Sequence, residues 1–228
     1  ETVGDLLREI TESERGAGPE SGDLAARLRH AGQLLDEDQR QWLQPRGPLT
    51  RLLGSGLLAL DRAILPSLVP LSVRGQQNAD GHQSTLFIAN HRSYLDAPLL
   101  LAALPKHRLE HTYWGGATSV MFRNRLLRLV SRAARVLPVQ PQRQSAASLA
   151  LAAGALERGN NLVWFPEGGI SPDARLQPFH SGIAVLLTAR PVPVVPVWID
   201  GAQEALPVGS WRPRRRQVQI RFGKRVDS

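Results

Sequence analysis

A histidine and an aspartate five residues apart suggest the first piece of chemistry in this sequence. In FIANHRSYLDAPLL (87–100), His91 follows an apolar run and Asp96 follows the histidine. An imidazole titrates close to neutral pH and can take a proton from an alcohol, and a carboxylate on its second nitrogen fixes the tautomer and stabilises the imidazolium. On one continuous helix the two side chains would point about 140° apart. They can therefore meet only if His91 lies in a loop and Asp96 begins a helix.

The same residues also admit a structural interpretation. Ser93 and Asp96 have the spacing of a capping box with Ser93 as the N-cap. Pro98 would then fall past the first turn, where a proline costs about 3 kcal/mol. A helix that begins near Asp96 avoids this cost and leaves 90–95 as a loop. Ser93 next to His91 also raises the alternative of a serine nucleophile, but the sequence has no Gly-x-Ser-x-Gly elbow.

A second polar loop follows another apolar run. NLVWF (161–165) is followed at once by Pro166, Glu167 and two glycines. Ligands of open α/β sheets bind just beyond the carboxyl ends of the strands. We therefore expect the loop after 84–89 and the loop after 161–165 to converge at one edge of a sheet and form a site.

These two loops resemble the diagnostic blocks of the glycerolipid acyltransferase family, typified by 1-acylglycerol-3-phosphate acyltransferase. The blocks read NHRSYLD (90–96) and FPEGGISPD (165–173), and VPVVPV (192–197) is similar to a later block. The resemblance covers about residues 50–226. It implies transfer of an acyl group from an acyl-CoA or acyl-carrier-protein thioester, the co-substrate, to the hydroxyl of a (lyso)glycerophospholipid, with no further cofactor. No metal is expected, because His107 and His111 have i,i+4 spacing but no third ligand beside them.

The resemblance also implies roles for particular residues. His91 would be the general base and Asp96 its orienting partner. The implied substrate-binding residues are Asn90, Ser93, Arg143, Glu167, Gly168 and Gly169.

The sequence departs from the family pattern where cations usually recognise the phosphate of the acceptor. Ile170 stands where an arginine is common, and His180 stands where lysine is frequent. Arg143 is the nearest candidate phosphate ligand, with Arg175 as a weaker one. These departures leave two alternatives open: an acceptor without a phosphate, or a catalytically decayed module that only binds lipid.

A closer resemblance is to acyltransferase domains fused behind adenylate-forming acyl ligases in bacterial multidomain proteins. YWGGATSVMF (113–122) and IDGAQEALP (199–207) are similar to that subgroup, and TVGDLLREI (2–10) is similar to the tail of a preceding domain. The first residue is Glu1 rather than methionine. We therefore expect a segment of a longer chain, with a possible ligase domain as a partner.

Charge is distributed unevenly along the 228 residues. Residues 1–45 hold five Arg against ten acidic residues, a net charge of −5, whereas residues 46–228 hold 23 cations against ten acids, a net charge of +13. Such a basic surface predicts an anionic partner. We expect an anionic phospholipid surface, with the protein peripheral on the cytoplasmic face of the inner membrane. No nucleic-acid recognition motif accompanies WRPRRRQ (211–217), so no nucleic acid is expected.

Alternating apolar runs and amphipathic stretches predict an α/β fold with a mixed, largely parallel sheet flanked by helices. Residues 1–48 are predicted to be a short helical N-terminal appendage, with helices over 2–12 and 21–43, and residues 49–228 the acyltransferase domain. The apolar segment 52–73 is predicted to be a packed helix or an interfacial one, because Asp61, Arg62 and two prolines interrupt it. A membrane span is the third alternative for this segment. Further helices are predicted over 96–104, 119–136, 145–159 and 180–190. Strands are predicted over 84–89, 109–116, 137–140, 161–165, 192–199 and 217–222, the fifth being irregular or at an edge because of Pro193 and Pro196.

Overall fold

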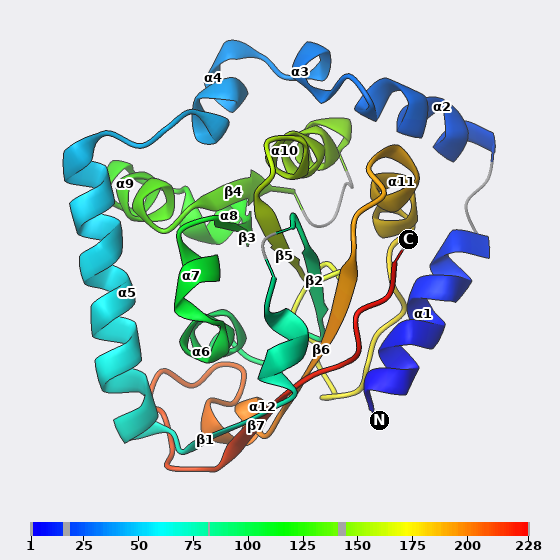
Figure 1. Ribbon diagram of the computed structural model, residues 1–228. Coiled ribbons are helices and arrows are strands. Elements are labelled where there is room, and N and C mark those ends of the chain that lie inside the picture. Colours follow the sequence, from blue (N-terminus) through cyan, green and yellow to red (C-terminus); the bar gives the residue numbers. More distant parts are fainter. Residues whose placement is uncertain (1, 16–18, 82, 141–144, 228) are drawn as a thin grey trace.

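A seven-stranded sheet with helices on both faces forms the centre of the protein (Figure 1). The computed structural model describes residues 2–15, 19–81, 83–140 and 145–227. The strand order is β1-β7-β6-β2-β5-β3-β4, and all neighbours are parallel except β6 and β7. The strands are β1 (Leu71–Arg74), β2 (Leu86–Ala89), β3 (Thr112–Ala117), β4 (Val136–Val139), β5 (Asn161–Trp164), β6 (Val194–Asp200) and β7 (Val218–Phe222). The predicted α/β fold with a mixed, largely parallel sheet is confirmed.

The helices are arranged in two layers around this sheet. The helices are α1 (Val3–Arg15), α2 (Pro19–Leu28), α3 (Ala31–Leu34), α4 (Glu37–Arg40), η1 (Gln41–Leu43), α5 (Pro48–Leu68), η2 (Gln76–Ala79), α6 (Asp96–Ala103), α7 (Lys106–Leu109), α8 (Thr118–Met121), α9 (Arg125–Ala133), α10 (Ala146–Glu157), α11 (Gly182–Ala189) and α12 (Ala202–Ala205). Helices α10 and α11 cover one face, with the N-terminal helices outside them, and α5, α6 and α9 lie on the other side (Figure 1).

Strand β2 lies in the middle of the sheet and is buried on both faces. Leu86 and Ile88 belong to the core beneath α10 and α11, whereas Phe87 and Ala89 belong to the core beneath α6. This double burial explains the continuous apolar run in the sequence. It also fixes the direction in which the polar loop leaves the strand.

Strand β6 corrects the prediction that the two prolines place it at an edge or make it irregular. It lies between β2 and β7 and is buried from Val194 to Ile199. The carbonyl of Pro196 accepts a hydrogen bond from the N–H of Gly223, so the missing N–H of Pro196 also faces that side. The β7 ladder ends at Phe222, so Pro196 lacks only a reciprocal bond to Gly223, one residue past the end of the ladder.

Two predicted long helices are wrong because side-chain caps start new helices within them. The predicted helix 21–43 is divided into α2, α3, α4 and η1, and Asp36 begins α4 by accepting the N–H of Gln39 in a capping box. The predicted helix 119–136 is divided into α8 and α9. Asn124 caps α9 by accepting the N–H of Leu127.

The N-terminal segment packs tightly on the α10 and α11 layer. Leu6, Ile10, Leu28 and Leu35 are buried within the same hydrophobic cluster as the side chains of α10 and α11. Helices α1, α2, α3 and η1 therefore contribute to the core. The domain boundary at residue 48 stays a prediction.

Helix α5 packs on α6 and α9 and leaves an apolar stripe exposed. Gly54 permits the close approach to α9, because a Cβ there would collide with the carbonyl of Ala133. Pro66 lies inside the helix, which ends only at Leu68. The exposed stripe consists of Leu49, Leu52, Leu53, Leu60, Ile64 and Leu68. No helix in the described residues is long and apolar enough to cross a membrane.

Candidate active site

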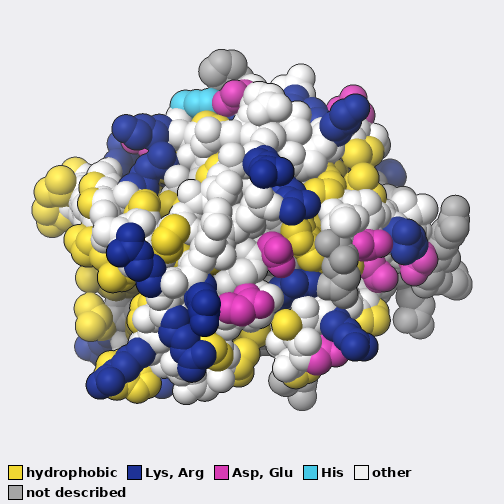
Figure 2. Space-filling model, turned by 90° about the horizontal axis from the view of Figure 1, so that it is seen from below, with side chains coloured by type: hydrophobic (Ala, Val, Ile, Leu, Met, Phe, Trp, Pro, Cys, Tyr) yellow, Lys and Arg dark blue, Asp and Glu magenta, His cyan; other side chains and the backbone are white. Residues whose placement is uncertain are grey.

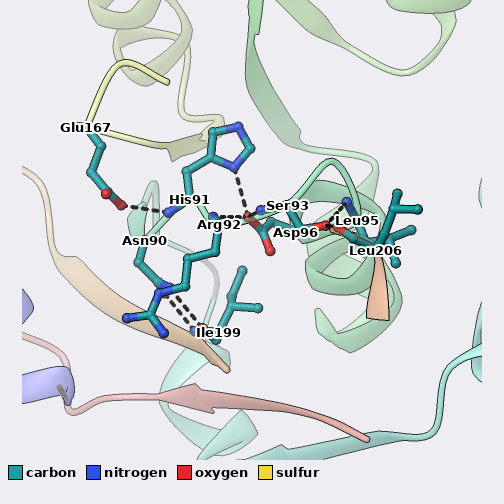
Figure 3. A network of polar contacts seen from close by, with 9 residues as sticks. All are labelled: Asn90, His91, Arg92, Ser93, Leu95, Asp96, Glu167, Ile199 and Leu206. Atoms are coloured by element: carbon teal, nitrogen blue, oxygen red, sulfur yellow. Dashed lines mark hydrogen bonds and ion pairs between the residues drawn. The ribbon is translucent and has the colours of Figure 1, made fainter. Parts of the chain in front are cut away.

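The histidine and the aspartate meet at the carboxyl end of β2, as the spacing predicts. His91 lies in the loop after β2, Asp96 is the first residue of α6, and their Nδ1 and Oδ2 atoms are 2.9 Å apart (Figure 3). The same Oδ2 accepts the backbone N–H groups of Arg92 at 2.6 Å and Ser93 at 2.7 Å. Because a carboxylate can only accept, Nδ1 of His91 carries the proton, and Nε2 is left free to act as a base.

The loop after β5 holds His91 from three sides. Glu167 Oε1 accepts the backbone N–H of His91 at 2.7 Å, and Ser171 donates its N–H to the carbonyl of His91 at 2.8 Å. The ring of Phe165 stacks on the imidazole, with 4.3 Å between centroids and 25° between planes. The two loops therefore converge as expected, and the orientation of the imidazole is set by both.

Glu167 is buried, with both carboxylate oxygens bonded to the backbone. Its Oε2 accepts the N–H of Gln177 at 2.9 Å, while its Oε1 accepts that of His91. Burial raises the pKa of Glu167 to about 7, against the opposing effect of these two N–H groups and of the nearby His91 and Arg92. This geometry ties the two loops together through one titratable carboxyl.

Gly168 and Gly169 form the turn that follows Glu167, and both line a pocket beside His91. Gly168 has φ of 72°, in the left-handed region that favours glycine, and its N–H bonds to the carbonyl of Phe165. A Cβ on Gly169 would meet no atom within 4 Å. The turn therefore leaves its backbone open toward the pocket.

Asn90 and Ser93 are fully buried and do not line the pocket. The Asn90 amide accepts the N–H of Ile199 at 2.7 Å and donates to its carbonyl at 2.8 Å, which joins the end of β2 to β6. Ser93 Oγ donates to the carbonyl of Leu206 at 2.9 Å and accepts the N–H of Leu95. The structure thus places both residues as supports of the loop rather than beside a substrate.

Arg92 also joins the loop after β2 to strand β6, through contacts that the sequence did not suggest. Its guanidinium lies 4.6 Å from the Trp198 ring centroid and 3.7 Å from Asp200 Oδ1, both on β6. These contacts join residues more than a hundred positions apart. No local pattern in the sequence signals them.

The pocket beside His91 has a volume of about 380 Å³ and mostly apolar walls. Its apolar wall residues include Val120, Val139, Leu149, Trp164, Phe165 and Ile183. Within the described residues the lining contains no Lys or Arg. Arg143 lies outside the described residues, and Arg175 is exposed on the loop after β5. Such a pocket suits an apolar ligand that ends next to the imidazole.

Histidines elsewhere do not form a metal centre in the described part of the chain. His107 and His111 are exposed near the start of β3. No group of three His, Asp or Glu side chains that could hold a metal ion occurs among the described residues.

Comparison with known proteins gives consistent matches. A 1-acyl-sn-glycerol-3-phosphate acyltransferase of Brassica napus is 26% identical over 144 residues, 60% of this chain and 39% of that protein. One from Limnanthes alba is 24% identical over 158 residues, 68% of this chain and 53% of that protein. The chain thus spans about half or less of these relatives. The crystal structure of the 1-acyl-sn-glycerophosphate acyltransferase PlsC from Thermotoga maritima shares the fold, with a TM-score of 0.63, 20% identity, and coverage of 82% of this chain and 75% of that one.

The family model named Acyltransferase matches residues 70–200, more than half of the chain. This range contains β2 with its histidine loop, β5 with its glutamate loop, and nearly all of the pocket lining. The chain belongs to the acyltransferase family.

Proposed function

We propose that the protein is an O-acyltransferase that moves an acyl group from a thioester to the hydroxyl of a lysoglycerophospholipid. The observation that carries this proposal is the position of His91, which lines an apolar pocket while its Nδ1 is bonded to the buried Asp96. An imidazole held in this way has one basic nitrogen beside a space that suits an acyl chain. The matched relatives bear the names of enzymes of this class.

The reaction follows from this arrangement in two steps. His91 Nε2 takes the proton of the acceptor hydroxyl as its oxygen attacks the thioester carbonyl, and Asp96 stabilises the imidazolium that forms. The tetrahedral intermediate then collapses, the carbon–sulfur bond breaks, and the imidazolium returns the proton to the leaving thiolate. The thioester is already activated, so no covalent enzyme intermediate is required.

The acceptor class depends on which cations lie near the pocket. A lysophosphatidate-like acceptor requires cations for its phosphate, and we propose Arg143 and Arg175 for that role. A non-phosphate acceptor is the competing possibility, favoured by Ile170 and His180 at two positions where cations are expected. The proposed donor is a thioester of either coenzyme A or acyl-carrier protein.

We further propose that the enzyme works at an anionic membrane surface, on its cytoplasmic side. The apolar stripe of α5 supports this, since Leu49 is 81% exposed and Leu52 is 71% exposed. Figure 2 shows hydrophobic side chains gathered at the left edge, where α5 lies in Figure 1, with Lys and Arg groups beside them. Exposed apolar area flanked by cations favours an interfacial position. An adenylate-forming ligase in the same polypeptide would supply the donor locally.

The test is release of free thiol from a long-chain acyl-CoA, and separately from acyl-carrier protein, with lysophospholipids and glycerol 3-phosphate as acceptors. Acceptor-dependent release should fall by about 10²–10⁴-fold in His91→Ala, because general-base help contributes that much. His111→Ala is the matched control, since His111 is an exposed histidine outside the pocket lining.

The outcomes separate the alternatives. Release that is lost in His91→Ala and kept in His111→Ala would establish the enzyme and name its acceptor. No release from any pair of donor and acceptor would reject the proposal and favour the lipid-binding module. Circular dichroism of both variants checks that the fold is unchanged.

A further inference from the structure

The segment between α12 and β7 concentrates positive charge on an exposed loop. We call residues 207–217 the arginine loop, because they contain Arg212, Arg214, Arg215 and Arg216, all exposed. It is drawn in orange at the lower left of Figure 1. Within the described part of the chain, no carboxylate lies at ion-pair distance from any of the four guanidinium groups. Four uncompensated cations within five positions favour an anionic ligand.

The arginine loop begins next to the loop after β2, which carries His91. Ser93, three residues before Asp96, donates its hydroxyl hydrogen bond to the carbonyl of Leu206, the residue before the arginine loop. Val208 lines the same pocket as His91. The backbone N–H of Arg214 donates to the carbonyl of Ala205 at 2.7 Å, so the loop folds back onto its own beginning. The cations therefore stand on a loop whose base borders the pocket.

An exposed indole accompanies these cations. Trp211 is 79% exposed, and the Arg212 guanidinium lies 4.7 Å from its ring centroid. Exposed aromatic faces stack with nucleobases, and guanidinium groups bind phosphates through paired hydrogen bonds. The loop thus offers the two kinds of contact that a phosphorylated nucleotide needs.

We infer that the arginine loop binds the nucleotide part of coenzyme A and thereby positions the thioester donor. This rests on the proposed function, in which the acyl chain occupies the pocket and the thioester carbon lies beside His91 Nε2. The pantetheine arm must then leave through the mouth of the pocket and carry its phosphates past the loop. Arg212, Arg214, Arg215 and Arg216 would bind the phosphates, and Trp211 would stack with the adenine.

A bilayer is the rival ligand for these cations, and the location of the arginine loop favours the donor. The loop shares Val208 with the pocket, and its four cations fall within five positions of the sequence. Apart from Val208 and Trp211 on the loop itself, most of the exposed apolar side chains gather on α5. A role in donor binding predicts an effect that depends on the phosphates of the donor, whereas a role in membrane binding does not.

The experiment compares two donors that carry the same acyl group. One is acyl-CoA, and the other is acyl-pantetheine, which has the thioester but no phosphates and no adenine. The variant replaces all four arginines of the loop with glutamine, and the acceptor is a soluble short-chain lysophospholipid without vesicles. The matched control replaces Arg27, Arg40, Arg125 and Arg128 with glutamine, which removes the same charge from exposed positions outside the pocket lining.

The expected result is a change in KM for one donor only. In the loop variant the KM for acyl-CoA should rise about tenfold or more, with kcat within about twofold, because ground-state contacts to phosphate are lost. The KM for acyl-pantetheine should not change, and the control variant should behave as the parent with both donors. Trp211→Ala should raise the KM for acyl-CoA by a smaller factor.

Three results would overturn the inference. They are an equal rise in KM for both donors, no rise for either, and a parent enzyme that uses only acyl-carrier protein. A parent enzyme that releases no thiol from any donor would instead reject the proposed function. Thermal denaturation of each variant confirms that its fold is intact, since all the substituted side chains are exposed.

Discussion

Two of the loops that border the pocket, the loop after β2 and the arginine loop, are built in opposite ways. In the loop after β2, Asn90, Ser93 and Asp96 are fully buried, and each is bonded to backbone groups. In the arginine loop, Trp211 and the four arginines are exposed and make few contacts with the rest of the protein. The first loop is held by buried hydrogen bonds, whereas the second presents its side chains to solvent.

The difference agrees with the two tasks that we propose for these loops. Proton transfer needs a base held within hydrogen-bond reach of its target, and buried bonds to His91 and Asp96 supply that rigidity. Binding of phosphates needs charge at the surface, where long cationic side chains adapt to the ligand. Changes in the first loop should therefore lower kcat or stability, and changes in the second should alter KM.

Asp96→Asn should produce the largest loss of activity, because it removes the negative charge and leaves an oxygen for the existing hydrogen bonds. All three hydrogen bonds to Asp96 reach the same oxygen, Oδ2, so an amide oxygen there can accept all of them. The neutral amide cannot stabilise the imidazolium, and kcat should fall by about 10²–10⁴-fold with a small change in KM. Steady-state kinetics measures this, and a loss smaller than about tenfold would contradict the role given to Asp96.

Glu167→Gln should have an intermediate effect, and the effect is a change in how the free energy of unfolding depends on pH. The folded pKa of Glu167 is raised from 4.5 to about 7, so the folded state binds more protons than the unfolded state between these values. Its contribution to stability is present at low pH and is lost as pH rises through 7. Relative to the variant, the parent should lose up to about 3 kcal/mol of unfolding free energy between pH 5 and pH 8.

Urea denaturation at the two pH values measures this difference. The exposed Glu204→Gln is the matched control and should show the same pH dependence as the parent. A Glu167→Gln profile that also follows the parent would show that Glu167 is not the group responsible.

Ser93→Ala should have the smallest effect and tests the link between the two loops. Removing the hydroxyl takes away the bond to the Leu206 carbonyl and the acceptor for the Leu95 N–H, at a cost of about 1–2 kcal/mol in stability. Turnover should stay within about tenfold of the parent, because Ser93 does not line the pocket. Complete loss of turnover in a folded variant would instead revive the serine nucleophile.

The elements that depend on local sequence were predictable. The run before His91 is apolar at every position, which indicates a strand buried on both faces, and Pro98 placed the start of α6 at Asp96. Ser145 and Gly159 bound α10 as expected: Ser145 accepts the Ser148 N–H, and Gly159 has φ of 74°. The convergence of the loops followed from the rule for parallel sheets.

Features that depend on distant partners were not predictable. The position of β6 was misjudged because the sequence does not show that Pro196 faces the point where β7 ends. Asp36 and Asn124 are polar residues inside amphipathic patterns, and only their hydrogen bonds mark them as caps. Glu167 was expected beside the acceptor, yet its two oxygens bind backbone groups of two loops.

The position of β2 in the sheet also bears on how the chain acquires its structure during synthesis. Its two neighbours are β5, which begins 75 residues later at Asn161, and β6, which begins at Val194. Until these partners have been synthesised, the apolar strand β2 is an exposed, aggregation-prone segment of the nascent polypeptide. Early ribosomal products that stop before Asn161 should therefore depend on chaperones, and the loop after β2 should become ordered only after most of the chain has been translated.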